Sequence, residues 1–425
     1  MAKFTSTVYQ NEFLPDQGTD VHAIVSVTCD EAGSAGNLGN DVGEVIIVDT
    51  SGSMIGSRLE MAKRAAMVAC DTILDGTWFA IVAGTHQAYL AYPRVVSGPG
   101  MVRMSAATRA EAKRAIASFR ADGGTAIGAW LLLTRQLFAS IGTLTGRHAI
   151  LLTDGEDYNE TAAQLDAAIR PCIGEFQVDC RGIGVDWKVS EVRKIAQALL
   201  GSVDIIPDVR DLPQVMAQLI AQAMSRGVAD AQLRVWIPQD AQILFVRQVS
   251  PTVEDLTHRG QAINPLTQTY PTGAWGDETR DYHIAVRLPA KAVGQEQLAA
   301  RVQVAIGTEL LTQGLVKARW SADPTLTTRI SPEVAHYTGQ TELATAIQEG
   351  LAARAAGDDR TATQKLGRAV QLAKLTGNDE ATARLGRVVE VADAATGTVR
   401  LRRDIAKVDE MALDTVSTKT TRIRG

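Results

Sequence analysis

The spacing of hydrophobic residues changes along the chain and divides it into regions of different secondary structure. Between residues 43 and 226, short apolar runs alternate with stretches in which apolar residues recur every three or four positions. The run Val45-Ile-Ile-Val48 is apolar on both faces, which is typical of a strand inside a parallel sheet. Alternating strands and helices predict an α/β domain whose parallel sheet carries helices on both faces, joined by right-handed crossovers.

The individual elements of this α/β domain can be located from the same pattern. The predicted strands are residues 45–48, 78–82, 148–152, 176–180 and 203–206, with an edge hairpin through 88–90. The predicted helices are residues 59–73, 108–118, 127–141, 159–170, 188–200 and 209–225.

Beyond residue 228 the helical periodicity stops, and β-branched segments separated by Pro, Gly and Asp turns take its place. They are residues 233–237, 243–246, 282–288, 301–306 and 315–320. This pattern is typical of a β-sandwich, but five strands are few for a closed one. The strand-like residues 4–30 would cover its open edge. We therefore predict a split β-sandwich, residues 1–32 and 228–325, into which the α/β domain of residues 43–226 is inserted.

Residues 332–397 return to helical spacing, in three apolar stripes. Glycines that recur every 20 residues follow the stripes and are expected to end the helices: Gly357, Gly377 and Gly397. We predict a small α-helical bundle, an array of helical hairpins similar to a degenerate tetratricopeptide unit. The last segment, residues 398–425, is rich in Thr and from Val399 carries seven Lys or Arg against four Asp or Glu. Its last twelve residues, 414–425, hold four threonines and a serine, and we expect this end of the chain to be mobile.

Composition and charge narrow the function classes. The chain has 425 residues, with 43 basic and 48 acidic side chains and a net charge of -5. This balance argues against nucleic acid as a partner, because a basic footprint is missing. The four cysteines show no CxxC spacing, so we interpret them as reduced thiols rather than zinc ligands or a disulfide framework.

Targeting signals are not evident in the sequence. The N-terminal residues contain no continuous apolar stretch typical of a signal peptide. No run approaches the roughly 18 apolar residues of a membrane span. The glycine-rich residues 31–43 lack the GxxxxGK[ST] pattern of a phosphate-binding loop and are interpreted as a flexible linker. We therefore expect a cytoplasmic protein without a membrane span.

Oxygen-bearing side chains follow the ends of two predicted strands and begin one predicted helix. The first strand ends in Asp49-Thr-Ser51-Gly-Ser53, and a later strand ends in Thr-Asp154. Between them, Asp122-Gly-Gly-Thr125 presents a hydroxyl just before a helix. Open α/β sheets bind ligands at the carboxyl edge of their strands, and hard cations prefer oxygen ligands. The pattern predicts a cation site at this edge.

These three segments, in this order, resemble the metal-ion-dependent adhesion site of a von Willebrand factor A domain. The resemblance covers about residues 43 to 225 and implies a Rossmann-like α/β fold. It implies that the hydroxyls of Ser51, Ser53 and Thr125 approach the ion, and that Asp49 and Asp154 act directly or through water. Mg²⁺ is the expected ion, with Mn²⁺ or Ca²⁺ as alternatives.

The resemblance also implies a function in protein binding. In this family an Asp or Glu of a partner protein completes the coordination shell, and ligation can be coupled to movement of the last helix, here residues 209–225. We therefore expect a metal-dependent scaffold rather than an enzyme. An adaptor of an AAA+ ATPase and, less favoured, a metal-dependent phosphohydrolase remain as alternatives.

The enzyme alternatives find little support in the sequence. A phosphotransferase DxDx[TV] motif would need a second Asp where this chain has Ser51, and neither an HExxH nor a GxSxG motif occurs. His148 begins a predicted strand and is assigned a structural role. Glu156 and Asp157 follow the predicted site and are expected to shape its rim or to start the next helix.

The whole-chain organisation resembles bacterial cytoplasmic von Willebrand A proteins that carry a β domain and a helical C-terminus. That resemblance implies association with Ser/Thr kinases, PP2C-type phosphatases or forkhead-associated (FHA) domain proteins. It nominates four threonines of the tail as phosphorylation sites: Thr415, Thr418, Thr420 and Thr421.

Overall fold

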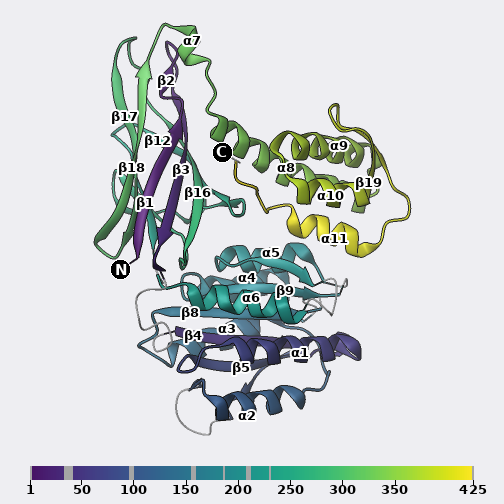
Figure 1. Cartoon of the computed structure of the whole chain (residues 1–425). Helices are drawn as coiled ribbons and strands as arrows, with labels where there is room; N and C mark the ends of the chain where they lie inside the picture. Colours follow the sequence, from purple (N-terminus) through teal and green to yellow (C-terminus); the bar gives the residue numbers. More distant parts are fainter. Residues whose placement is uncertain are drawn as a thin grey trace. The chain divides into compact units, whose positions relative to one another are not determined.

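The computed structural model describes residues 2–32, 42–94, 100–154, 159–184, 187–206, 212–228 and 231–423 (Figure 1). The chain divides into two compact units. The α/β unit comprises Met1–Ala2, Glu31–Ala229 and Gly273–Gly276, and the sandwich–helix unit comprises Lys3–Asp30, Asp230–Thr272 and Asp277–Gly425. The prediction of an α/β domain inserted in a β-sandwich is thus confirmed. Most of the predicted linker, residues 31–43, lies outside the described residues.

A mixed sheet forms the centre of the α/β unit, with strand order β10-β9-β8-β4-β5-β6 and β7 paired to β5. Its strands are β4 (Val42–Asp49), β5 (Trp78–Gly84), β6 (Ala88–Tyr92), β7 (Val102–Arg103), β8 (Gly146–Thr153), β9 (Gln177–Ile183) and β10 (Val203–Ile206). Strands β4, β5, β8, β9 and β10 are parallel, whereas β6 and β7 pair with β5 in the antiparallel sense. The central strand β4 is buried along its whole length, as its apolar run predicts.

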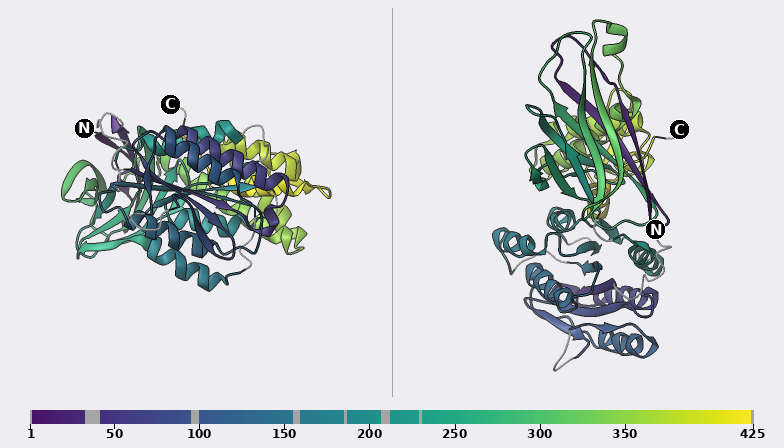
Figure 2. Two further views of the ribbon diagram at one scale, coloured as in Figure 1. Left: turned by 90° about the horizontal axis from the view of Figure 1, so that it is seen from below. Right: turned by 90° about the vertical axis from the view of Figure 1, so that its left-hand side faces the viewer.

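Helices cover both faces of this sheet, as Figure 2 shows. They are α1 (Ser57–Thr72), α2 (Ala106–Ala117), α3 (Ile127–Ala139), α4 (Ala162–Ile169), α5 (Val189–Ala198) and α6 (Leu212–Ser225), with short turns η2 (Gly52–Met54) and η3 (Arg170–Cys172). One apolar cluster joins α1, α2 and α6 to alternate residues of β4, among them Ile46 and Val48. Helices α3 and α4 pack together, and α3 contacts β4 and β5. The predicted helices of this region are all present, with ends that differ by a few residues.

Two sheets form the sandwich, and the N-terminal strands belong to both. The first has order β1-β3-β16-β12-β13 and the second β14-β15-β11-β17-β18-β2. Strand β3 pairs with β16 in the antiparallel sense, and β2 pairs with β18 in the parallel sense. The strands are β1 (Lys3–Gln10), β2 (Phe13–Leu14), β3 (Asp20–Asp30), β11 (Gln232–Trp236), β12 (Gln242–Ser250), β13 (Glu254–Asp255), β14 (Gln261–Asn264), β15 (Thr267–Pro271), β16 (Glu278–Arg287), β17 (Glu296–Ile306) and β18 (Glu309–Trp320). A short turn, η4 (Thr257–Arg259), follows β13.

The helical part of the sandwich–helix unit differs from the sequence prediction after the second helix. Its elements are α7 (Pro324–Thr327), α8 (Pro332–Ala355), α9 (Asp359–Thr376), α10 (Asp379–Val388), β19 (Val389–Asp393), β20 (Thr398–Leu401) and α11 (Lys407–Val416). Gly357 and Gly377 have positive φ just after α8 and α9, as predicted. Gly397 does not end a helix, because the third stripe passes from α10 into the β19–β20 hairpin.

The C-terminal segment is not the mobile tail that its composition suggested. It contains β20 and α11, and α11 buries Met411, Leu413 and Val416. Leu413 joins the apolar cluster of α8, α9 and α10. Burial of these three side chains stabilises α11 although most residues of the segment are polar. The composition of the segment does not show how its few apolar residues are spaced along a helix.

Two further features bear on the sequence predictions. All four cysteines are free and buried, which agrees with their interpretation as reduced thiols. Within the described ranges, no helix is long and apolar enough to cross a membrane.

Candidate metal centre

The predicted cation site begins at the carboxyl ends of two adjacent parallel strands. Asp49 is the last residue of β4 and Thr153 the last of β8, and the register pairs Val48 with Leu152. Asp154 follows directly, and the turn η2 carries Ser51 and Ser53 away from β4 toward α1. Parallel pairing therefore brings residues about 100 positions apart to one edge of the sheet.

Three side-chain oxygens form a contiguous group at this edge. The hydroxyls of Ser51 and Ser53 are 2.9 Å apart, and the Ser53 hydroxyl donates to Asp154 Oδ1 at 2.8 Å. Neighbouring ligands of an octahedral Mg²⁺ ion are also separated by about 3 Å, because each lies about 2.1 Å from the ion. The spacing of these oxygens therefore fits a small hard cation.

Asp49 lies beneath this group and is held from two sides. Its Oδ1 accepts a hydrogen bond from the Ser51 amide at 2.9 Å, and its Oδ2 accepts one from the Thr153 hydroxyl at 2.6 Å. The carboxyl group is buried, and burial raises the pKa of Asp49 to about 6 although both hydrogen bonds lower it. A nearby cation would compensate this desolvation.

The Thr125 loop is attached to the Ser51–Ser53 turn through the main chain. The Gly52 amide donates to the Gly123 carbonyl at 2.8 Å, and the Thr125 amide donates to Asn159 Oδ1 at 2.8 Å. Gly123 has φ +74°, and a Cβ on Gly124 would lie 1.8 Å from Asn159 Oδ1, so the Gly-Gly pair is required for this approach. Thr125 itself is buried.

The structure thus joins four of the five predicted residues, Asp49, Ser51, Ser53 and Asp154, in one hydrogen-bonded cluster. Thr125 is held beside the cluster by its loop. In the part of the chain that the structure describes, no group of three or more His, Cys, Asp or Glu side chains is placed to hold a metal. The predicted cluster instead combines hydroxyls with the two carboxylates of Asp49 and Asp154. Glu156 and Asp157, expected at its rim, lie outside the described residues.

Three residues that contribute to this centre were not nominated from the sequence. Arg58 Nη1 donates to Asp154 Oδ2 at 3.0 Å, Thr153 donates to Asp49, and Asn159 holds the Thr125 amide. Thr153 could have been found because it ends the strand that Asp154 directly follows. Arg58 occupies a polar position on the surface of α1, and nothing in the sequence indicates that it pairs with Asp154.

The four nominated threonines belong to the sandwich–helix unit and are all engaged in the structure. Thr415 is buried, and its hydroxyl donates to the Met411 carbonyl at 2.7 Å. The Thr418 carbonyl accepts from the Val253 amide at 2.7 Å. The Thr420 hydroxyl donates to the Val249 carbonyl at 2.7 Å.

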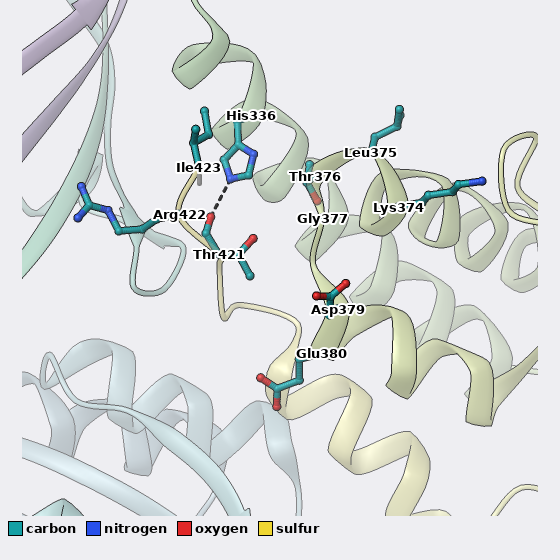
Figure 3. A pocket seen from close by; sticks show the side chains of 10 residues that line it. All are labelled: His336, Lys374, Leu375, Thr376, Gly377, Asp379, Glu380, Thr421, Arg422 and Ile423. Atoms are coloured by element: carbon teal, nitrogen blue, oxygen red, sulfur yellow. Dashed lines mark hydrogen bonds between the residues drawn. The ribbon is translucent and has the colours of Figure 1, made fainter. Parts of the chain in front are cut away.

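Thr421 lies at the edge of a cavity of about 540 Å³ between the C-terminal segment and the α9–α10 turn (Figure 3). Its hydroxyl accepts from Gln340 Nε2 at 2.8 Å, and its carbonyl lies 2.7 Å from His336 Nε2. Of the four nominated threonines, Thr415 is the most deeply buried, whereas Thr418, Thr420 and Thr421 are partly exposed.

A mostly parallel sheet covered by helices, with an Asp- and Ser-based cluster at the carboxyl end of its central strand, defines a von Willebrand A type of α/β protein. The family model of the von Willebrand factor type A domain matches residues 44–205, and that of the von Willebrand factor type A C-terminal domain matches residues 371–417. The solved structure of a von Willebrand factor type A protein from Catenulispora acidiphila is 46% identical, with a TM-score of 0.93, and the match covers 99% of this chain and 97% of that one. The chain belongs to the von Willebrand factor type A family.

More distant relatives extend the comparison. The ArnB paralog VWA2 from Sulfolobus acidocaldarius shares the fold with a TM-score of 0.60 at 14% identity, and the match covers 98% of both chains. An uncharacterized protein of Synechocystis is 29% identical over 220 residues, which are 51% of this chain and 50% of that protein. The chain therefore matches only half the length of this curated relative.

Proposed function

We propose that this protein is a metal-dependent protein-binding module. In this proposal Asp49, Ser51, Ser53, Thr125 and Asp154 hold Mg²⁺, with Mn²⁺ or Ca²⁺ as substitutes. When bound, the ion would supply a positive charge and a coordination position for a carboxylate of a partner protein. The observation that carries the proposal is the contiguous group of oxygens of Ser51, Ser53 and Asp154 at 2.8–2.9 Å spacing.

The charge and exposure of the centre support a carboxylate as the incoming group. It contains two buried carboxylates, and one of them is paired with Arg58. A divalent ion would leave the centre with net positive charge, which favours an anionic ligand. Ser53 is exposed, so the centre is accessible to a side chain of another protein.

A binding role explains the centre better than catalysis. Ser51 takes the position at which a phosphotransferase of the DxDx[TV] type would carry its second Asp, and its hydroxyl is committed to Ser53. His148 is buried between two carboxylates and is not available to a substrate. We therefore propose a non-enzymatic scaffold. Release of phosphate from a phosphoester by the purified protein with Mg²⁺ would overturn this part of the proposal.

The cellular setting is a further part of the proposal. The resemblance to bacterial von Willebrand A proteins supports a role beside a Ser/Thr kinase, a PP2C-type phosphatase or an FHA-domain protein. Four free, buried thiols suit a reducing compartment, and we propose the cytoplasm. Phosphorylation would then be expected at the partly exposed Thr418, Thr420 or Thr421 before the buried Thr415.

A pulldown with matched variants tests the central claim. Wild-type protein, Asp49→Ala and Asp71→Ala are each used as bait with Mg²⁺ and with EDTA. Asp71→Ala is the control because it removes an exposed carboxylate from α1, away from the cluster. We expect partner capture by wild type and Asp71→Ala only with Mg²⁺, and none by Asp49→Ala. Capture that persists in EDTA and in Asp49→Ala would contradict metal-dependent binding. An AAA+ ATPase among the captured proteins would instead identify an adaptor.

A further inference from the structure

Arg58 is positioned to influence the candidate metal centre. It lies in the first turn of α1, which starts four residues after Ser53. Its Nη1 donates to Asp154 Oδ2 at 3.0 Å and to the Ser53 carbonyl at 3.3 Å. The side chain of Asp154 is fully buried, whereas that of Arg58 is 34% exposed. The guanidinium therefore lies on the solvent-exposed side of Asp154.

This contact occupies the second oxygen of Asp154. Its Oδ1 accepts from the Ser53 hydroxyl at 2.8 Å, so both carboxylate oxygens have donors. A buried carboxylate without a compensating charge is costly, and Arg58 supplies that charge in the protein without metal. A cation that binds beside Ser51 and Ser53 would interact with the same Asp154 carboxylate and would be repelled by the Arg58 guanidinium.

We propose that Arg58 is a built-in counter-cation that couples the ion to an acidic partner. Without metal it pairs with Asp154 and stabilises the cluster. It weakens the binding of a divalent ion on its own, because the two cations compete for Asp154. When a carboxylate ligand arrives, Arg58 pairs with it at the exposed side, so the ion and the ligand bind more tightly together than separately. This inference rests on the proposed function, since it requires the metal centre.

The first part of the proposal, that Arg58 weakens binding of the ion alone, is tested by measuring metal binding without a partner protein. Mn²⁺ affinity is measured by titration calorimetry for wild type, Arg58→Gln, Arg58→Lys and Arg64→Gln. Arg64 is an exposed residue of the same helix, so Arg64→Gln is a charge-matched control. We expect Arg58→Gln to bind Mn²⁺ about tenfold more tightly than wild type, and Arg58→Lys and Arg64→Gln to remain close to wild type. Equal or weaker binding by Arg58→Gln would overturn the inference.

The second part of the proposal, that Arg58 helps a carboxylate ligand to bind with the ion, is tested with acetate as the carboxylate probe. Mn²⁺ titrations are repeated in sodium acetate and in sodium chloride of the same ionic strength. We expect acetate to tighten Mn²⁺ binding by wild type and to have a smaller effect on Arg58→Gln. An equal effect on both proteins would overturn the role of Arg58 toward the ligand.

Thermal unfolding separates this inference from the function on which it rests. Without metal, Arg58→Gln should unfold at a lower temperature than wild type, and Mn²⁺ should raise its unfolding temperature by more than that of wild type. If wild type, Arg58→Gln and Asp49→Ala all fail to respond to Mn²⁺, the metal centre itself is wrong and the inference falls with it. If wild type responds and Arg58→Gln matches it in both measurements, only the role of Arg58 is wrong.

Discussion

Arg422 makes a two-pronged ion pair with Asp281, a residue 141 positions earlier in the chain. Nε and Nη2 of Arg422 lie 2.9 and 3.0 Å from the two carboxylate oxygens, and Nη2 also donates to the Ser26 hydroxyl at 2.9 Å. Tyr337 of α8 donates its hydroxyl to the same Asp281. The pair therefore connects the C-terminal segment to β3 and β16 of the sandwich and, through Asp281, to the first long helix of the bundle.

Loss of Arg422 should loosen this connection. Arg422→Ala leaves the buried Asp281 carboxylate with only the Tyr337 hydroxyl among these donors, and we expect a loss of about 1–3 kcal/mol in unfolding free energy. Denaturant unfolding measures the stability, and limited proteolysis should cut the C-terminal segment faster in the variant. Arg403→Ala, which removes an exposed arginine of the same segment, is the control. Equal stability of the two variants would show that the ion pair contributes nothing.

The structure of the C-terminal segment could not be predicted from the sequence. Its basic and Thr-rich composition predicted a mobile tail, because composition does not reveal a partner such as Asp281 or a backbone bridge such as that between Thr252 and Lys419. Strand β14 was missed for a related reason. All its residues are exposed, so it has no alternation of apolar and polar positions to detect.

The α/β unit was easier to predict because its pattern is strong and local. Runs such as that of β4 are buried on both faces, and all but β5 of the parallel strands are followed by a helix of regular period. The closeness of Asp49, Ser51, Ser53 and Asp154 could be predicted from strand ends, since parallel strands bring their carboxyl ends to one edge. Arg58 could not be distinguished from Arg64, because both are polar positions on one helix and only the tertiary structure places one beside Asp154.

The buried His148 network is expected to make the stability of the α/β unit depend on pH. Nδ1 lies 2.9 Å from both Glu44 oxygens, and Nε2 lies 2.9 Å from Asp179 Oδ2. Burial alone would lower the pKa of His148, but the two carboxylates outweigh it and raise the pKa to about 9. The folded pKa exceeds the ordinary value of 6.5, so this stabilisation is complete below about pH 6.5 and is lost as pH rises through about 9.

We therefore expect the unfolding temperature of wild type to fall between pH 6.5 and 9, and that of His148→Gln to change less over this range. The variant should also lose about 3 kcal/mol at pH 7, because two buried carboxylates lose their shared cation. The lowered pKa of Asp179 places its own titration at acid pH, whereas burial raises the pKa of Glu44, which is present in both proteins. Parallel pH profiles for the two proteins would contradict a charged His148.

The Gly-Gly pair before Thr125 should be sensitive to a single methyl group. In Gly124→Ala the new Cβ would lie 1.8 Å from Asn159 Oδ1, so the Asn159 side chain must move and release the Thr125 amide. We expect Mn²⁺ affinity to fall about tenfold, as for a displaced positioning residue, while the protein stays folded by circular dichroism. Gly142→Ala, where the added Cβ would meet no atom within 4 Å, is the control. Wild-type affinity in Gly124→Ala would show that this loop does not position a ligand.

Thr153 offers a test of how Asp49 is positioned. Its hydroxyl donates to Asp49 Oδ2 at 2.6 Å within a buried site, and Thr153→Val removes this donor with little change in volume. We expect the variant to lose about 1–3 kcal/mol of stability without metal, because the buried carboxylate loses a hydrogen bond. Its Mn²⁺ affinity should fall about severalfold, because Asp49 is then held only by the Ser51 amide among these two donors. Thr134→Val is the matched control, since the Thr134 hydroxyl donates within α3, to the Trp130 carbonyl at 2.9 Å. It should share some of the stability loss but none of the loss of affinity. If Thr153→Val bound Mn²⁺ as tightly as Thr134→Val, the bond between Thr153 and Asp49 would serve folding alone.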